Sequence, residues 1–490
     1  MSRTKTHFFL FLAFLLILPL AVAAQPQNPN DPAKVKSQLY DAISTGDAQK
    51  FASLIDQVGK TDRDDFLLYV LSQSQQQPLE IVRVLVDKGA DVNQPSSSST
   101  ALMRAANKGY VDIVRLLLSK GAQVNVNVDD GTPLMVAVNA GQVEIIKLLL
   151  AAGADVKAVH RMGDQALMMA AEQRSYRTPS AEPNAEVVQL LLDHGADPKA
   201  RGEWNRTALM LANTAAKVKL LLAKGAEVDA KDEYGQTALM HAAKRGNAAV
   251  AAALLDNGAS VNLTDNKGLT ALLYSLDDEN MAHGDEAKTL PARRSEVARR
   301  ILLAKGVDVN AANADGETPL IRAIRLKNVE TIKALLAKGA DAKKSDVFGD
   351  TAVTLAYNSE NPEIQKLLPA NTLKGLAPNV LNAYLRAAIE KKDEAKVKEL
   401  LTAGADPNHE YAIGYNHKRI KSTVLILAAS IGHPGIVQLL VDKGANVSAK
   451  GLLSGSEHGL VYGTALEAAE SSKHTEVAAL LRKLTKPPVN

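Results

Sequence analysis

The sequence predicts an all-α solenoid built from short helix pairs that stack on one another along the chain. Two short phrases recur at a nearly constant distance, and self-similarity at a fixed period indicates a repeat architecture. Hydrophobic residues make up 46% of the 490 residues but aromatic residues only 4%, so the apolar mass is mostly Ala, Leu and Val. Small aliphatic side chains of this kind suit tightly stacked helices.

The first phrase is a threonine followed by a small residue or proline and then by leucine. Several successive threonines lie 32 or 33 residues apart. The second phrase, Gly-Ala, follows the threonine after 21 residues at four places: Gly121, Gly153, Gly258 and Gly339. The threonines are Thr100, Thr132, Thr207, Thr237, Thr270, Thr318, Thr351, Thr423 and Thr464.

Both phrases, together with an Asp-x-x-Gly-x-Thr turn that begins at Asp232, Asp265 and Asp346, resemble the ankyrin repeat family. The resemblance covers the chain from about Ser37 to the C-terminus and implies an ankyrin-repeat solenoid of about thirteen helix-pair repeats with β-hairpin fingers. It leaves too few residues for a separate catalytic domain.

Each phrase has a physical reason within such a repeat. The threonine hydroxyl caps the first helix, and Pro133 and Pro319 occupy the first helical position, where no amide hydrogen is needed. A glycine such as Gly153 ends the second helix in the left-handed conformation. Leucine pairs such as Leu148–Leu149 pack on neighbouring repeats, because a single repeat cannot bury its own apolar face.

One position departs from the family pattern, because methionine replaces the usual histidine at the fourth place of the threonine phrase. We expect these methionines only to pack, and we prefer this interpretation to a soft-metal site. They are Met103, Met135, Met168, Met210 and Met240.

Residues 1–24 have the three-part pattern of a secretory signal peptide. Arg3 and Lys5 precede an apolar run from residue 8 to 18, and small residues end at Ala24. An uncleaved membrane anchor is the alternative. Secreted eukaryotic proteins of this size usually contain disulfides, whereas this chain has no cysteine. We therefore expect export to a bacterial periplasm, with an extracellular or membrane-tethered location as the alternatives.

After the signal, we expect two repeat arrays, residues 33–370 and 376–490, joined where the Gly-Ala turn is missing. One continuous stack with a distorted repeat is the alternative. Four insertions interrupt the period, at residues 173–184, 277–291, 408–423 and 448–464. Arginines 293, 294, 299 and 300 follow the second insertion, and we expect them on a solvated helix face rather than in a site for an acidic partner.

Candidate partner-binding residues lie on the fingers, because repeat proteins place specific function in loops on a rigid scaffold. Trp204, the only tryptophan, is expected to be exposed at a finger tip. The two long fingers at residues 408–423 and 448–464 belong to consecutive repeats, so we expect them to meet. Their candidate residues are Tyr411, Tyr415, His417, Lys418, Arg419, His458 and Tyr462.

The formal net charge of +3 disfavours a nucleic-acid partner, and the absence of cysteine excludes iron–sulfur and Cys-ligated zinc sites. We find no nucleotide motif and expect no catalytic, metal or cofactor-binding residue. The resemblance implies a non-enzymatic scaffold that binds a protein partner through its concave face and fingers, and the signal pattern adds the expectation of export. The alternatives are a metal-binding or enzymatic protein that uses histidines in the C-terminal loops, and a membrane-tethered scaffold.

Overall fold

The computed structural model describes residues 31–73, 78–94, 99–128, 131–172, 185–277, 285–359, 361–368, 378–415, 418–456 and 459–485. The chain divides into two compact units, Met1–Val128 and Asp129–Asn490. The predicted signal at 1–24 and the insertion at 173–184 lie outside the described residues. None of the described helices is long and apolar enough to cross a membrane.

The described part of the first unit consists of three helix pairs. The rings of Phe51 and Phe66 meet edge to face with centroids 6.1 Å apart, in the core of the first two pairs. The pairs are α1 (Pro32–Thr45) with α2 (Ala48–Leu54) and the 3-10 turn η1 (Ile55–Gln57), α3 (Lys60–Ser72) with α4 (Leu79–Asp87), and α5 (Ala101–Lys108) with α6 (Val111–Ser119).

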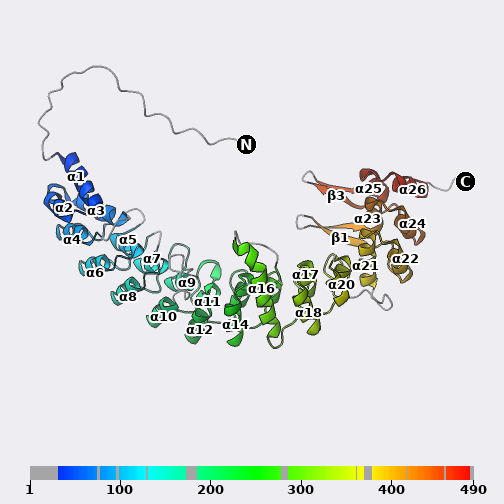
Figure 1. Ribbon diagram of the computed structural model, residues 1–490, viewed down its shortest axis with the longest axis horizontal. Helices are drawn as coiled ribbons and strands as arrows, with labels where there is room; N and C mark the ends of the chain where they lie inside the picture. The colour runs from blue at the N-terminus through cyan, green and yellow to red at the C-terminus, as the bar shows by residue number, and fades with distance from the viewer. Residues whose placement is uncertain are drawn as a thin grey trace, which may run out of the picture. The chain divides into compact units, whose positions relative to one another are not determined.

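The second unit holds ten helix pairs among its described residues (Figure 1). First helices contact first helices of the neighbouring pair, and most second helices contact second helices of the neighbouring pair. The pairs are α7 (Pro133–Asn139) with α8 (Val143–Ala151), α9 (Ala166–Glu172) with α10 (Ala185–Asp193), α11 (Ala208–Leu211) with α12 (Ala215–Ala223), α13 (Ala238–Lys244) with α14 (Ala248–Asp256), α15 (Ala271–Tyr274) with α16 (Asp285–Leu303), α17 (Pro319–Arg325) with α18 (Val329–Ala337), α19 (Ala352–Asn358) with α20 (Pro362–Leu367), α21 (Pro378–Glu390) with α22 (Glu394–Thr402), α23 (Val424–Ile431) with α24 (Pro434–Asp442), and α25 (Ala465–Ser471) with α26 (Thr475–Thr485).

The repeated phrases do what their chemistry predicts. Thr318 is the N-cap of α17, its hydroxyl accepts a hydrogen bond from the amide of Ile321 at 3.3 Å, and Pro319 is the first helical residue. Gly153 follows α8 with a φ of 85°, the left-handed region that side chains disfavour. The prediction of an all-α solenoid of about thirteen helix pairs is confirmed.

The methionines at the fourth position are all buried, as expected, but the expectation that they only pack is wrong for two of them. The sulfur atoms of Met210 and Met240 lie 3.5 and 3.4 Å from the amide nitrogens of Thr207 and Thr237 and accept weak hydrogen bonds. These amides belong to the N-cap residues, so a side chain at this position completes the helix cap.

Asparagines in the turns after several of the second helices connect neighbouring repeats. Nδ2 of Asn310 donates to the carbonyl of Gly339 at 3.3 Å, and its Oδ1 accepts from the amide of Asp341 at 2.7 Å. Asn262 makes the corresponding pair of bonds to Gly306 and Asp308. One amide side chain thus satisfies both a donor and an acceptor in the next turn along the stack.

The predicted array boundary at residues 370–376 lies outside the described residues and stays a prediction. The helices on either side of it contact each other, α19 with α21. The hydroxyl of Tyr357 donates to Oδ2 of Asp393 at 2.9 Å, and the rings of Tyr357 and Tyr384 lie 6.0 Å apart.

Three insertions can be followed in the structure. From Asp285 onward the insertion at 277–291 is helical and lengthens α16 (Figure 1). The two C-terminal insertions form antiparallel hairpins. Their strands are β1 (Glu410–Tyr415) and β2 (Lys418–Thr423), then β3 (Gly451–Ser456) and β4 (Gly459–Gly463).

Lys217 on α12 is fully buried, which is unusual for a lysine. Its Nζ donates to the carbonyl oxygens of Ala170 and Ala171 at 2.7 and 3.3 Å, near the C-terminal end of α9. Burial lowers the pKa of this amine to about 8. The amine therefore satisfies helix-end carbonyls at the expense of its own hydration.

We predict that Asn310→Ala lowers the free energy of unfolding by about 1–2 kcal/mol, because it leaves the carbonyl of Gly339 and the amide of Asp341 without their partner. Urea unfolding followed by circular dichroism measures this loss. Asn310→Asp keeps the acceptor and loses the donor, so its loss should be smaller. An unchanged midpoint for Asn310→Ala would contradict the assigned role.

We predict that the stability of the wild type relative to Lys217→Met rises between about pH 8 and 10.5. In this window the unfolded chain, with a lysine pKa near 10.5, binds the proton, while the folded chain, with a pKa of about 8, has released it. Urea unfolding of both proteins at pH 7.5 and 9.5 gives the difference between their free energies of unfolding. Other groups that titrate in this range contribute equally to both proteins and cancel. A constant difference would show that the amine is not desolvated.

Candidate functional site

A groove of about 830 Å³ is the main candidate site in the described part of the second unit. Its walls are two fingers, the C-terminal end of α13 and the N-terminal half of α16. The two fingers are the loops that precede α11 and α13. Its lining residues are Trp204, Arg206, Asn213, Asp232, Tyr234, Gln236, His241, Lys244, Arg245, Asn247, Leu290, Arg293 and Arg294.

Two exposed aromatic rings stand at the finger tips. Trp204, in the short turn η2 (Glu203–Asn205), is 48% exposed and has a φ of 53°, and Tyr234 is 53% exposed. The carbonyl of Trp204 accepts the amide of Glu233 at 3.0 Å, and the carbonyl of Tyr234 accepts that of Asn266 at 3.0 Å. Backbone bonds from tip to tip therefore fix the spacing of the rings.

Asp232 holds the second finger in shape. Its Oδ1 accepts the amides of Tyr234 and Gln236 at 2.9 and 2.8 Å, and its Oδ2 lies 2.8 Å from Nε2 of His241. Burial alone would raise the pKa of Asp232, but the bonds from His241 and these amides outweigh it and lower the pKa. Burial also lowers the pKa of His241, so the imidazole is a neutral donor to the carboxylate.

The lengthened α16 forms one wall of the groove. It packs against the turn between α13 and α14, where Gly246 has a φ of 63°. A β-carbon on Gly246 would lie 2.9 Å from Cβ of Arg293 and 3.2 Å from the amide nitrogen of Arg294, so only glycine permits this approach. The guanidinium groups of Arg293 and Arg294 donate to the carbonyls of Arg245 and Lys244, both at 3.0 Å.

The arginines after the insertion do not all lie on a solvated face as the sequence suggested. Arg294 is 3% exposed, because its side chain also reaches the carbonyl of Asp277 at 2.7 Å. Arg299 and Arg300 are exposed and both pair with Glu296. No sequence motif points to the other groove cations, because Arg206 comes from one finger and Lys244 and Arg245 from the end of α13.

Trp204 is exposed as the sequence predicted, but Tyr411 is not. Its ring is 8% exposed, belongs to the core of the C-terminal repeats, and lies 5.0 Å below the guanidinium of Arg386. The expectation that Tyr411 lines a surface is wrong, because the first residues of β1 still pack on the helix stack.

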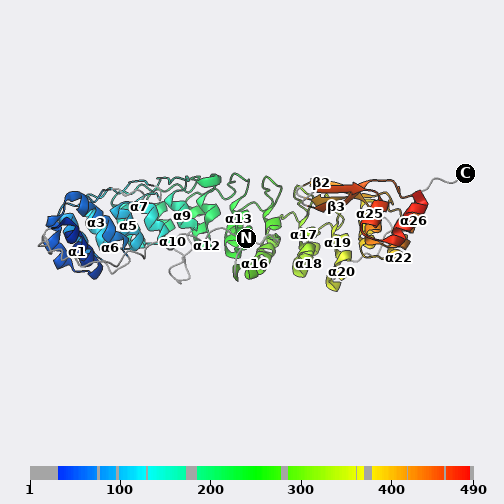
Figure 2. The same cartoon turned by 90° about the horizontal axis from the view of Figure 1, so that it is seen from above.

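The two C-terminal hairpins meet, as the sequence predicted. Figure 2 shows β2 and β3 side by side, and the hydroxyl of Ser422 donates to the carbonyl of Leu452 at 3.0 Å. Tyr462 on β4 is exposed. Tyr415, Lys418 and Arg419 lie in β1 and β2 at the hairpin end, whereas His417 and His458 lie outside the described residues.

Two of the described C-terminal histidines make hydrogen bonds within the helix stack. Nδ1 of His433 accepts the amide of Ile436 at 3.3 Å as the N-cap of α24, and Nε2 of His474 lies 3.0 Å from the carbonyl of Ser430. Burial lowers the pKa of His409. Among the described residues, no group of three or more His, Asp or Glu side chains is placed to hold a metal ion.

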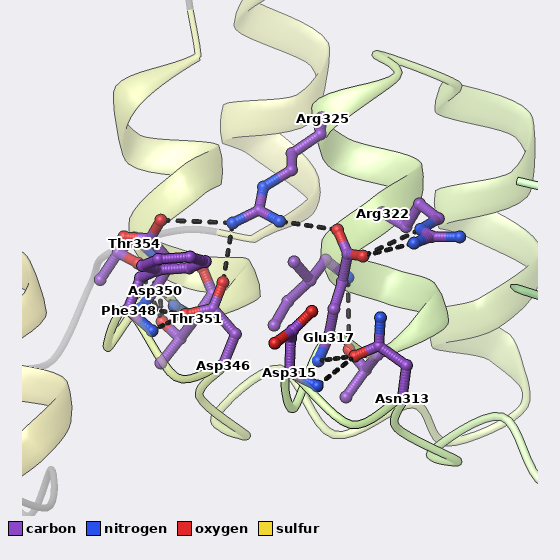
Figure 3. A network of polar contacts seen from close by, with 12 residues as sticks. Asn313, Asp315, Glu317, Arg322, Arg325, Asp346, Phe348, Asp350, Thr351 and Thr354 are labelled. Carbon is purple, nitrogen blue, oxygen red and sulfur yellow. Dashed lines mark hydrogen bonds and ion pairs between the residues drawn. The ribbon is translucent and has the colours of Figure 1, made fainter. Parts of the chain in front are cut away.

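A second cluster of charges joins two neighbouring fingers (Figure 3). Glu317 binds Arg322 at 2.7 Å and Arg325 at 2.6 Å, and Arg325 continues to Asp346 at 2.7 Å. Burial raises the pKa of Asp346 despite this partner. Each cation here faces carboxylates, so the cluster is a structural network, and sequence reasoning missed it because its members share no motif.

We predict that Arg325→Ala lowers the free energy of unfolding by about 2–4 kcal/mol, because it leaves Glu317 and the buried Asp346 with less compensation. Since Arg325 is partly exposed, the loss should fall short of that for a fully buried pair. Chemical unfolding measures it, with Arg299→Ala on the exposed face of α16 as the control. Equal stability of the two variants would refute the role of Arg325.

A family model described as ankyrin repeats (3 copies) matches residues 39–128, 125–202, 178–265, 209–284, 289–382 and 384–489. No match was found among the curated proteins. The matched segments cover most of the chain and agree with the stacked helix pairs and the capped phrases of the structure. The chain belongs to the ankyrin repeat family.

Proposed function

We propose that this protein is a non-enzymatic scaffold that binds a protein partner through the groove between residues 204 and 294 and through its fingers. Ankyrin repeats are in general protein–protein interaction modules. The observation that carries the proposal is the groove itself, which is lined by two exposed aromatic rings and several cations.

The residues that line this groove are of the types that anchor protein interfaces. Aromatic and arginine side chains supply much of the affinity of protein interfaces, because they bury a large area at a low entropic cost. Trp204 is held by its backbone bond to the next finger and by Arg206, whose guanidinium lies 4.7 Å from the ring centroid. A partner would therefore meet anchors that are already in place.

The same geometry favours binding over catalysis. His241 and Asp232 are the one pair of lining residues that could act as base and orienting acid. Asp232 accepts two hydrogen bonds from amides of its own finger and one from His241 on α13, and the lining residues include no serine, threonine or cysteine that could act as nucleophile. The contact between His241 and Asp232 therefore has a structural role, because it holds the finger in shape.

The two C-terminal hairpins are a second part of the proposed partner surface. They meet through β2 and β3 and present Tyr462 to solvent. Tyr411, Ser422 and Leu452 at their bases are buried, so these three residues are not part of the surface that a partner would contact.

Export belongs to the same proposal. Residues 1–24 have the pattern of a cleavable signal, which would place the scaffold in a periplasm. A retained segment would instead tether it to the membrane, and a metal or enzymatic role for the C-terminal histidine loops is the remaining alternative.

The proposal is tested by affinity capture on the immobilised full chain from extracts of its native cells, with bound proteins identified by mass spectrometry. We expect a protein that the wild type retains to be lost by Trp204→Ala/Tyr234→Ala, or by a variant in which glycine–serine links replace residues 413–420 and 454–460. Leu303→Ala, a change of an exposed side chain outside the groove, should retain it.

Thermal unfolding by circular dichroism checks that each variant remains folded. Capture of the same proteins by the wild type and both altered surfaces would overturn the proposal, and so would the absence of any protein retained by the wild type.

A further inference from the structure

We propose that the groove binds an acidic segment of the partner, with carboxylate side chains against Lys244 and Arg293 and an apolar side chain against Trp204. This inference rests on the proposed function and specifies the chemistry of its ligand. Three features of the structure support it: the excess of cations among the described lining residues, the backbone carbonyls that orient them, and the carboxylate partners of other arginines in the same stack.

Among its described lining residues, the groove carries more cations than carboxylates. Five of its lining residues are cations, namely Arg206, Lys244, Arg245, Arg293 and Arg294, and Asp232 is the lining carboxylate. The carboxylate of Asp232 accepts hydrogen bonds from two amides of its own finger and from His241 on α13. Arg206 pairs with Glu203 at 3.5 Å, which leaves the positive field concentrated toward α13 and α16.

Backbone carbonyls orient the cations near α16. The guanidinium of Arg245 donates to the carbonyl of Met210 at 2.9 Å, and that of Arg293 donates to the carbonyl of Arg245 at 3.0 Å. A carbonyl is a neutral acceptor, so the bond to the Arg245 carbonyl fixes the position of Arg293 without cancelling its charge. The exposed side chain of Arg293 and the half-buried Lys244 border the groove from two different helices.

Other arginines of the stack show that this arrangement is particular to the groove. On the same α16, Arg299 and Arg300 lie 2.6 and 3.1 Å from Glu296, and their hydrogen bonds lower the pKa of Glu296 to about 2. In the network of Figure 3, Arg325 faces Glu317, Asp346 and Asp350. In both places carboxylates of this chain take the role that we assign to the ligand in the groove.

A carboxylate-bearing peptide fits this site better than a nucleic acid does. Guanidinium and ammonium groups bind carboxylates through charge-assisted hydrogen bonds, and the adjacent indole offers an apolar contact for a neighbouring side chain. Nucleic-acid binding depends on many phosphate contacts and on a strongly basic surface, whereas this chain has a net charge of only +3.

Trp204 supplies a direct readout, because it is the only tryptophan of the chain and lines the groove. The probe is a short acetylated and amidated peptide of alternating Glu and Leu, titrated into the full chain while tryptophan emission is recorded. We expect a saturating change that weakens as salt is added. Matched peptides with Gln or Lys in place of Glu should bind at least tenfold more weakly.

The variant Lys244→Glu/Arg293→Glu should bind the Glu peptide at least tenfold more weakly than the wild type. Lys305→Glu, an exposed reversal outside the groove, should bind as the wild type does. Both variants keep Trp204, and circular dichroism confirms their folding. Lys244→Gln/Arg293→Gln gives a smaller loss and serves as a second variant if the reversal disturbs the fold.

Equal binding of the Glu and Gln peptides would overturn the inference, as would equal weakening by Lys305→Glu or tighter binding of oligothymidylate than of the Glu peptide. If a captured protein depends on Trp204 and Tyr234 while no Glu peptide binds, the acidic ligand is wrong and the scaffold function stands. If no partner is captured although the Glu peptide binds as described, the proposed function fails by itself.

Discussion

A helix pair of this protein cannot bury its apolar face without the next pair, and the rest of the structure depends on this constraint. Ile332 and Leu335 on α18 are fully buried although the helix has only nine residues. The turns add hydrogen bonds between neighbouring pairs, as the side chain of Asn310 does with Gly339 and Asp341 of the next pair. Stability therefore arises between neighbours, so a side chain at a repeat junction affects two pairs at once.

The same dependence sets the positions of the fingers. Because the amide of Glu233 donates a backbone hydrogen bond to the carbonyl of Trp204 in the tip before it, Trp204 and Tyr234 stand at a spacing that the stack imposes. Asp232 then closes its finger with three hydrogen bonds. Two exposed aromatic rings are thus held in place by the stack itself, which lowers the entropic cost of the partner binding that we propose for the groove.

Specific features appear where the period is broken. The insertion after α15 lengthens α16, and Gly246 allows that helix to approach the turn before α14 closely enough to bring Arg293 and Arg294 to the groove. The two C-terminal insertions form hairpins that meet through Ser422 and Leu452. The regular repeats supply stability, and the departures from them supply the surfaces to which we assign recognition.

The sequence by itself determined the solenoid, the approximate number of repeats, the threonine caps, the left-handed glycine at Gly153 and the exposure of Trp204. Each of these depends on a few neighbouring residues whose local chemistry is the same in every repeat. Only the tertiary structure decided that Tyr411 is a core residue beneath Arg386, and that Arg294 is buried against Lys244. Those contacts join residues 25 and 50 positions apart, and the stacking of whole helices, rather than any local pattern, determines which charges meet.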